Sequence, residues 1–162
     1  MIQNNLFTET NDNASIPAIQ EVEIIYSGPK TSKLVQVKTS REVATLLRDQ
    51  VYDARKINYK ESFYVLLLNR ANKVIAQACV GMGSTTATVM NAKEIFQLAL
   101  KTNACGIILS HNHPSGNLKP SDADIQITNK VKQFGNMIDI QLLDHIILTD
   151  ESYYSFADEG LI

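Results

Sequence analysis

The sequence has 162 residues, 44% of them hydrophobic, so its length and composition suit one domain with a sizeable core better than two domains. A net charge of −2 at pH 7 provides no overall basic field, and binding to nucleic acid is therefore not indicated. The N-terminus lacks the basic and apolar regions of a signal peptide, and no apolar run approaches the ~18 residues of a membrane helix. These features predict a cytoplasmic protein with no membrane segment.

The N-terminal part of the chain is expected to lie outside the core. Residues 1–17 are polar, rich in Asn and Thr and without periodicity, which is typical of a disordered tail. Residues 18–39 are interpreted as a short β extension, because apolar runs at 21–26 and 34–37 flank turn residues and could form a hairpin. Residues 40–162 form the predicted domain.

Within this domain, apolar spacing predicts helices and strands in alternation, with Ser40 as the N-cap of the first helix. Cys79 and Cys105 lie far apart among apolar residues and are predicted to be buried thiols without a disulfide. The order of elements favours an α/β fold, a single domain with a mixed, curved β-sheet flanked by helices. The predicted strands are 60–69, 74–80, 85–89, 105–110, 138–148 and 152–156, and the predicted helices are 40–54, 91–102 and 124–134, the last ending at Gly135.

The segment at 110–124, SHNHPSGNLKPSDAD, has the layout of a metal site. His111 and His113 follow an apolar run, and in an extended segment side chains two residues apart share a face, roughly 6.6 Å apart at the backbone. Asp124, in the first turn of the following helix, could supply a third ligand. Two imidazoles and a carboxylate suit catalytic zinc, because the fourth position is left to water. Alternatively, Asp124 forms an S-x-x-D capping box with Ser121, which for this residue alone is the favoured interpretation.

The pattern H-x-H-P, six residues, then S-x-x-D resembles the JAMM signature of the JAB/MPN metalloenzymes. Together with the later LLDHIIL and SF…GL, it is similar to the RadC-like branch of that family over about residues 40–162. The resemblance implies a JAB1/MPN-like, cytidine-deaminase-like architecture. It also implies one Zn²⁺ per chain, held by His111, His113 and Asp124, with Ser121 as a hydrogen-bond donor to the developing oxyanion.

In the family pattern, the catalytic glutamate opens an upstream strand, and the matching residue of this sequence is Glu61. Glu94 is the rival, but its spacing indicates an acid in the first turn of an amphipathic helix. His145 lies outside the motif and is interpreted as a structural group or one that acts on the metal ligands indirectly. A substrate groove, by the same resemblance, would include Gly83, Ser84, Thr85 and Thr86.

The resemblance implies a metallopeptidase or isopeptidase in which Glu61 activates a metal-bound water to cleave an amide bond of a peptide or isopeptide substrate. Two alternatives stay open: a DNA-repair-associated RadC-like protein, and a non-catalytic MPN interaction module. The chain is expected to be a short form without the helical DNA-binding-type region of full-length RadC-like proteins, which weakens the first alternative. Retention of the expected polar residues argues against the second. Whether the protein forms a homodimer is left open.

Overall fold

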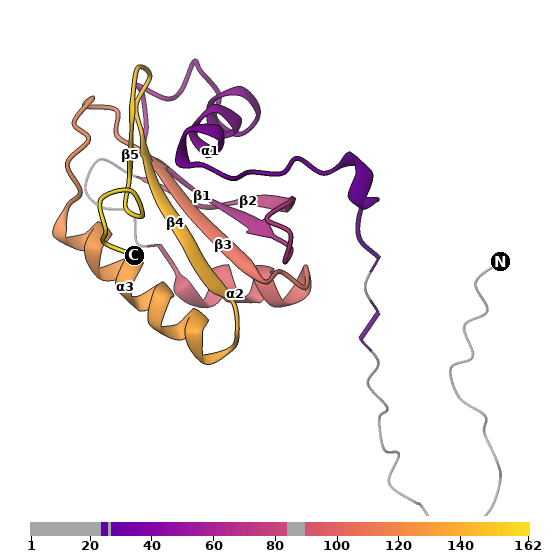
Figure 1. Cartoon of the computed structure of the whole chain (residues 1–162). Coiled ribbons are helices and arrows are strands. Elements are labelled where there is room, and N and C mark those ends of the chain that lie inside the picture. Colours follow the sequence, from indigo (N-terminus) through magenta and orange to yellow (C-terminus); the bar gives the residue numbers. More distant parts are fainter. Residues whose placement is uncertain (1–23, 26, 84–89) are drawn as a thin grey trace, which may run out of the picture.

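The structure, a computed structural model, describes residues 24–25, 27–83 and 90–162 (Figure 1). The predicted tail at 1–17 and the predicted strand at 85–89 lie outside these residues. So do three of the predicted groove residues, Ser84, Thr85 and Thr86. Within the described ranges, no helix is both long and apolar enough to cross a membrane.

The described strands form one five-stranded mixed sheet in the order β2-β1-β3-β4-β5. β1 (Ser62–Leu68) and β2 (Val74–Met82) are the predicted antiparallel hairpin. β3 (Gly106–Asn112) lies between β1, to which it is antiparallel, and β4 (Gln141–Leu148), to which it is parallel. β5 (Tyr153–Ser155) forms the outer edge beyond β4. The predicted mixed sheet is therefore confirmed.

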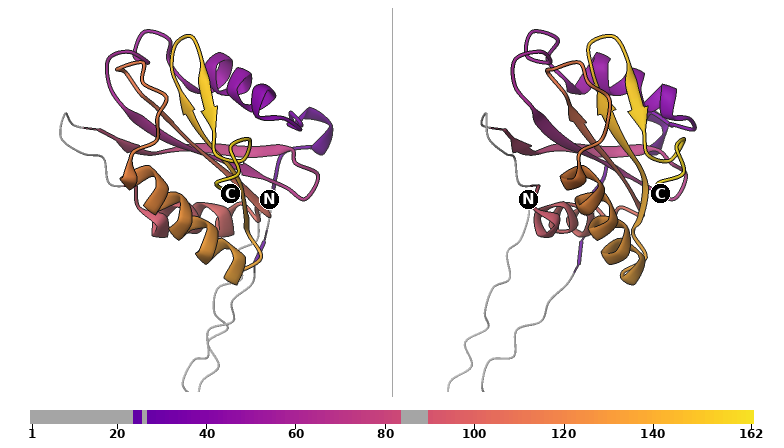
Figure 2. Two further views of the ribbon diagram at one scale, coloured as in Figure 1. Left: turned by 60° about the vertical axis from the view of Figure 1, so that its left-hand side comes forward. Right: turned by 90° about the vertical axis from the view of Figure 1, so that its left-hand side faces the viewer.

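Helices cover both faces of this sheet (Figure 2). α1 (Ser40–Leu46), which continues into the π-helical turn η2 (Leu47–Val51), packs on one face. α2 (Ala92–Lys101) and α3 (Asp122–Met137) pack on the other. Parallel strands need a long crossover, and α3 supplies the one between β3 and β4. The predicted α/β single-domain architecture is thus observed.

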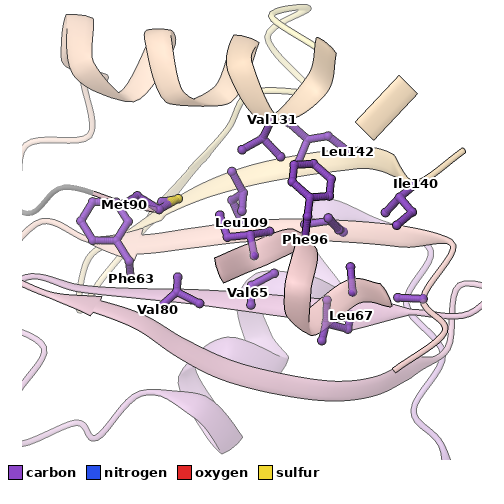
Figure 3. Packing of buried hydrophobic residues seen from close by; sticks show 14 residues of the cluster. Phe63, Val65, Leu67, Val80, Met90, Phe96, Leu109, Val131, Ile140 and Leu142 are labelled. Carbon is purple, nitrogen blue, oxygen red and sulfur yellow. The ribbon is translucent and has the colours of Figure 1, made fainter. Parts of the chain in front are cut away.

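Successive side chains of the central strands point to opposite faces of the sheet, so the core consists of two layers. Phe63, Val65 and Leu67 of β1 point toward α2 and α3, where they pack with residues such as Phe96 and Val131 (Figure 3). Leu66 and Leu68 point instead toward α1. β3 is buried along its whole length, so any polar side chain at its end is held in a rigid, largely dry setting.

The start of the domain differs from the prediction in two details. Thr39, not Ser40, caps α1, because the Thr39 side chain accepts a hydrogen bond from the Glu42 amide. Residues 34–37 contact the β1–β2 turn through a bridge between Gln36 and Lys73. Of the other predicted hairpin strand, residues 21–23 and 26 lie outside the described ranges, and Ile24 and Ile25 are exposed and not in a strand. A 3-10 turn, η1 (Thr31–Lys33), lies between the two segments.

Gly135 does not end α3, as the sequence suggested, but lies inside it. A Cβ at this position would lie 2.2 Å from the Ile140 carbonyl oxygen, so glycine is needed for close approach of the helix to the chain entering β4. The turn comes later, at Asp139, which has a φ of 56°.

The predicted burial of the cysteines is wrong. Cys79 is exposed on β2 and Cys105 is half-buried; both are free thiols.

Candidate metal site

The two histidines of the H-x-H pair lie where β3 ends. His111 is on the same face of β3 as Leu109, toward α3, and its ring is fully buried and stacked on Phe63 at 4.6 Å between centroids. His113, just beyond the strand, points the same way. The two Nε2 atoms lie 2.9 Å apart. The predicted convergence of these side chains is therefore observed.

Asp124 is both a helix-capping residue and a neighbour of the histidines. It forms a capping box with Ser121: its Oδ2 accepts hydrogen bonds from the Ser121 amide at 2.7 Å and the Ser121 hydroxyl at 2.6 Å. Its Oδ1 lies 3.2 Å from His111 Nε2, and its Oδ2 lies 3.9 Å from His113 Nε2. The two roles that the sequence offered as alternatives are thus compatible, since each can use a different oxygen.

Electrostatics keep Asp124 ionised. Burial acts to raise the pKa of its carboxyl group, but contacts with His111 and Ser121 outweigh burial and hold that pKa well below its usual range. The N-terminal end of α3 adds a favourable dipole for the negative charge. A charged, preoriented carboxylate is available beside the histidines at neutral pH.

Glu61, directly before β1, reaches the same place. Phe63 pairs with His111 in the antiparallel register, and continuing that register by two residues sets Glu61 opposite His113. A carboxylate oxygen of Glu61 and a ring nitrogen of each histidine all lie within 4.8 Å of one another. Glu61, His111 and His113 thus form a group that could hold a metal ion. The rival glutamate, Glu94, is in the first turn of α2, as its spacing predicted.

Gly83 holds the backbone of Glu61 directly, and Asn112 holds the residues before and after it. Asn112 is buried; its Oδ1 accepts a hydrogen bond from the Ser62 amide, and its Nδ2 donates to the Lys60 carbonyl at 2.9 Å and to the Ile57 carbonyl at 2.6 Å. The Gly83 amide donates to the Glu61 carbonyl at 2.8 Å. Among the predicted groove residues, Gly83 therefore adjoins the site. Sequence reasoning missed Asn112, whose position between the two histidines was its only signal.

The Nδ1 atoms of His111 and His113, which are the ring nitrogens farther from the metal site, both have hydrogen-bond partners. His113 Nδ1 lies 2.5 Å from the Asn117 carbonyl oxygen. His111 Nδ1 lies 2.9 Å from Nε2 of His145, whose Nδ1 lies 2.6 Å from the Thr128 hydroxyl. His145 is fully buried, and this burial lowers the pKa of its ring well below the usual range, so it is neutral. It matches the predicted indirect position, whereas no role was predicted from the sequence for Asn117 or Thr128.

The geometry suits a cation. Ligands about 2.1 Å from one tetrahedral ion are roughly 3.4 Å apart, close to the separations among His111, His113 and Asp124. The described side chains at this end of the sheet therefore combine nitrogen and oxygen donors around a common point. An α/β domain with this site falls in the class of JAB-type domains with a potential metal centre.

Comparison with known protein families supports the assignment to the JAB-type domains. A family model described as "RadC-like JAB domain" matches residues 37–161, and the chain belongs to this family. The chain is 42% identical over 129 residues to a UPF0758 protein of Flavobacterium johnsoniae, an alignment that covers 80% of the chain and 55% of that protein. It is 37% identical over 147 residues to a UPF0758 protein of Clostridium acetobutylicum, covering 91% of the chain and 62% of the relative. The chain spans about half the length of the curated relatives it matches.

Proposed function

We propose that this chain is a zinc-dependent hydrolase of the metallopeptidase or isopeptidase type, which cleaves an amide bond of a peptide or isopeptide substrate. The supporting observation is the convergence of Glu61, His111 and His113 within 4.8 Å, with Asp124 Oδ1 3.2 Å from His111. The two histidines come from the end of β3, Glu61 from directly before β1 and Asp124 from the first turn of α3, yet all present donor atoms to one region.

Zinc fits this donor set better than a hard cation does. Imidazole nitrogens suit zinc and related transition metals, whereas magnesium and calcium prefer sites made of oxygen atoms alone. His111, His113 and Asp124 would hold the ion. We assign the third ligand to Asp124 because its carboxylate is fixed by two hydrogen bonds from Ser121. Three protein ligands leave a position open to water and substrate, as catalysis requires.

Glu61 is the proposed general base. When bound, zinc would supply a Lewis acid that polarises a carbonyl group and lowers the pKa of water. Glu61, at the same site but not needed to complete a three-residue ligand set, would take a proton from the attacking water and pass it to the leaving amine. Its backbone is held by Gly83 on one side and its neighbour Ser62 is held by Asn112, so its position is well defined.

Ser121 is the proposed donor to the oxyanion. Its hydroxyl donates to Asp124 in this structure. Since the Ser121 amide also donates to the same oxygen, the hydroxyl can turn toward a substrate while Asp124 stays in place. A single oxyanion donor typically contributes about 100-fold or more in rate.

The test separates metal binding from catalysis. Wild type, Glu61→Gln and the matched control Glu94→Gln are loaded with zinc, assayed for metal content, and incubated with a peptide library whose cleavage is read by mass spectrometry. We expect about one zinc per chain in all three proteins and loss of cleavage by at least ~100-fold in Glu61→Gln alone. Equal cleavage by Glu61→Gln would refute the assignment of the base, and a zinc-loaded wild type that cleaves nothing would count against a peptidase.

A further inference from the structure

The three histidines of the sequence all lie in or beside the candidate metal site, and two of them form a chain that ends at a threonine of α3. His111 Nδ1 contacts His145 Nε2 at 2.9 Å, and His145 Nδ1 contacts Thr128 Oγ1 at 2.6 Å. Thr128 Oγ1 in turn lies 2.5 Å from the backbone carbonyl oxygen of Asp124. His145, Thr128 and His111 are all buried. The positions of the hydrogens in this chain decide which nitrogen of His111 is free.

The Asp124 carbonyl fixes one end of the chain, because a carbonyl oxygen can only accept. Thr128 must therefore donate its single hydroxyl hydrogen to Asp124, as serine and threonine often do to the carbonyl four residues earlier in a helix. The Thr128 oxygen then accepts from His145, which carries its hydrogen on Nδ1. A neutral His145 has no hydrogen on Nε2 and accepts from Nδ1 of His111. His111 Nε2 is left with a free lone pair toward Asp124 and His113.

His113 reaches the same state by a shorter route. Its Nδ1 contacts the Asn117 carbonyl, which can only accept, so the hydrogen is on Nδ1 and Nε2 is free. Both Nε2 lone pairs therefore face each other at 2.9 Å. The His111 Nε2 lone pair also faces the Asp124 carboxylate at 3.2 Å, so this arrangement is repulsive until a cation or a water hydrogen lies between these atoms.

The reverse order of donors is the competing arrangement. In it, Thr128 donates to His145, and His111 carries its hydrogen on Nε2. This order relieves the contact between the histidines and lets His111 Nε2 donate toward Asp124 Oδ1 at 3.2 Å. It leaves, however, no hydrogen between the Thr128 oxygen and the Asp124 carbonyl oxygen, which lie 2.5 Å apart inside the protein. Repulsion rises as the separation falls, and no ligand can enter there to relieve it. The two Nε2 atoms are farther apart, at 2.9 Å, and the His113 side chain is partly exposed, so water can donate to them there even before a metal ion binds.

We propose that Thr128 and His145 are positioning residues, which fix the tautomer of His111 so that its Nε2 is ready to bind metal before the metal arrives. The inference rests on the proposed function for the identity of the metal, but not for the tautomers themselves. A preset tautomer removes the need to move a proton when the ion binds. Partners of this kind typically contribute about 10-fold to 100-fold in metal affinity.

Nitrogen NMR of the zinc-free protein tests the proposal directly. With ¹⁵N-histidine labelling only three rings contribute signals, and at pH 8, well above the usual imidazole pKa, each neutral ring reports which nitrogen carries the hydrogen. We expect Nδ1–H for His111, His113 and His145. His111 found with its hydrogen on Nε2 would overturn the proposal.

A pair of variants at one position separates orientation from packing. Thr128→Val keeps the shape of the side chain but removes the hydrogen-bond acceptor for His145. Both His145 and His111 should then become mixtures of tautomers. Zinc affinity, measured against a competing chelator, should fall about 10-fold to 100-fold. Thr128→Ser keeps the hydroxyl and should restore both properties. Unchanged tautomers in Thr128→Val would refute the role of Thr128. If Thr128→Val does not fold, the wild-type spectrum and Thr128→Ser still decide.

Failure of the proposed function would look different. A folded wild type that binds no zinc would refute the zinc hydrolase, while the tautomers of the zinc-free protein would still confirm or refute the hydrogen-bond chain. A wild type that binds zinc and cleaves peptides, but has the reverse tautomers, would refute the chain alone.

Discussion

Replacing Gly135 by alanine tests how the helix that carries Asp124 is packed. In a helix interior, alanine is favoured over glycine by about 1 kcal/mol, so propensity alone predicts that Gly135→Ala stabilises the protein. The structure predicts the opposite. The new Cβ would lie 2.2 Å from the Ile140 carbonyl oxygen, which is backbone and cannot rotate away. The same segment is held by a 2.9 Å hydrogen bond from the Ile140 amide to the Gly135 carbonyl.

Overpacking of this kind typically costs about 3 kcal/mol at the upper end, which leaves a net loss of about 2 kcal/mol after the gain in propensity. That loss corresponds to a Tm about 4–8 °C lower for a domain of this size. The assay is thermal unfolding followed by circular dichroism, with the exposed neighbour Asn136→Ala as a control that gains propensity without the clash. A Tm of Gly135→Ala equal to or above that of the wild type would refute the close approach of α3 to β4.

Three further predictions concern the site. Ser121→Ala removes the N-cap hydroxyl and should lower the free energy of unfolding by about 1 kcal/mol. The zinc content should be retained, because the backbone amide of residue 121 still donates to Asp124. A loss of zinc equal to that of Asp124→Ala would contradict this prediction. Asn112→Ala leaves two backbone carbonyls and one amide without their hydrogen-bond partner. We expect the free energy of unfolding, measured in urea, to fall by at least ~2 kcal/mol, and catalysis to weaken because Glu61 is displaced. An unchanged free energy of unfolding would contradict this prediction. The folded-state pKa of His145 is lower than its unfolded value of 6.5, so below that pH the unfolded chain binds the extra proton. As the pH is lowered below 6.5, the free energy of unfolding of the zinc-free protein should therefore fall by up to about 1.4 kcal/mol per pH unit, at pH values well above those where Asp124 titrates. This slope should be smaller in His145→Gln. An equal slope in the two proteins would refute the role of His145.

The parts of the site that depend on local sequence could be predicted. The H-x-H pair lies on one face because β3 is extended, and Ser121 caps α3 because its side chain needs only residues three positions away. The hairpin of β1 and β2 likewise follows from a short turn between two apolar runs. In each case the interacting groups are close in sequence, so the chain has little freedom to place them otherwise.

Contacts that depend on strand register could not be worked out from spacing. Glu61 was matched by family resemblance, and it reaches His113 only because β1 pairs with β3 in one particular register. The contact between His145 and His111 depends on the parallel pairing of β3 and β4, which a crossover of many residues separates. The end of α3 was predicted wrongly for a related reason. Glycine is needed at position 135 because the Ile140 carbonyl oxygen lies close to it, and not because the helix ends there.

Exposure was misjudged where a residue lies on an edge strand. Cys79 has apolar neighbours in the sequence, but β2 is at the edge of the sheet and one of its faces is only partly covered. Sequence hydrophobicity indicates that a strand is present and does not say whether that strand is central.

The proposed zinc site is tested most directly by locating zinc in a crystal of this chain through anomalous diffraction at the zinc edge. We expect one strong peak about 2.0–2.2 Å from His111 Nε2, His113 Nε2 and an oxygen of Asp124, with Glu61 beside the remaining position. The peak should be absent from crystals of His113→Ala grown in the same way. Ordered wild-type crystals grown with excess zinc that have no peak at this point, or a peak bound by other residues, would contradict the central claim.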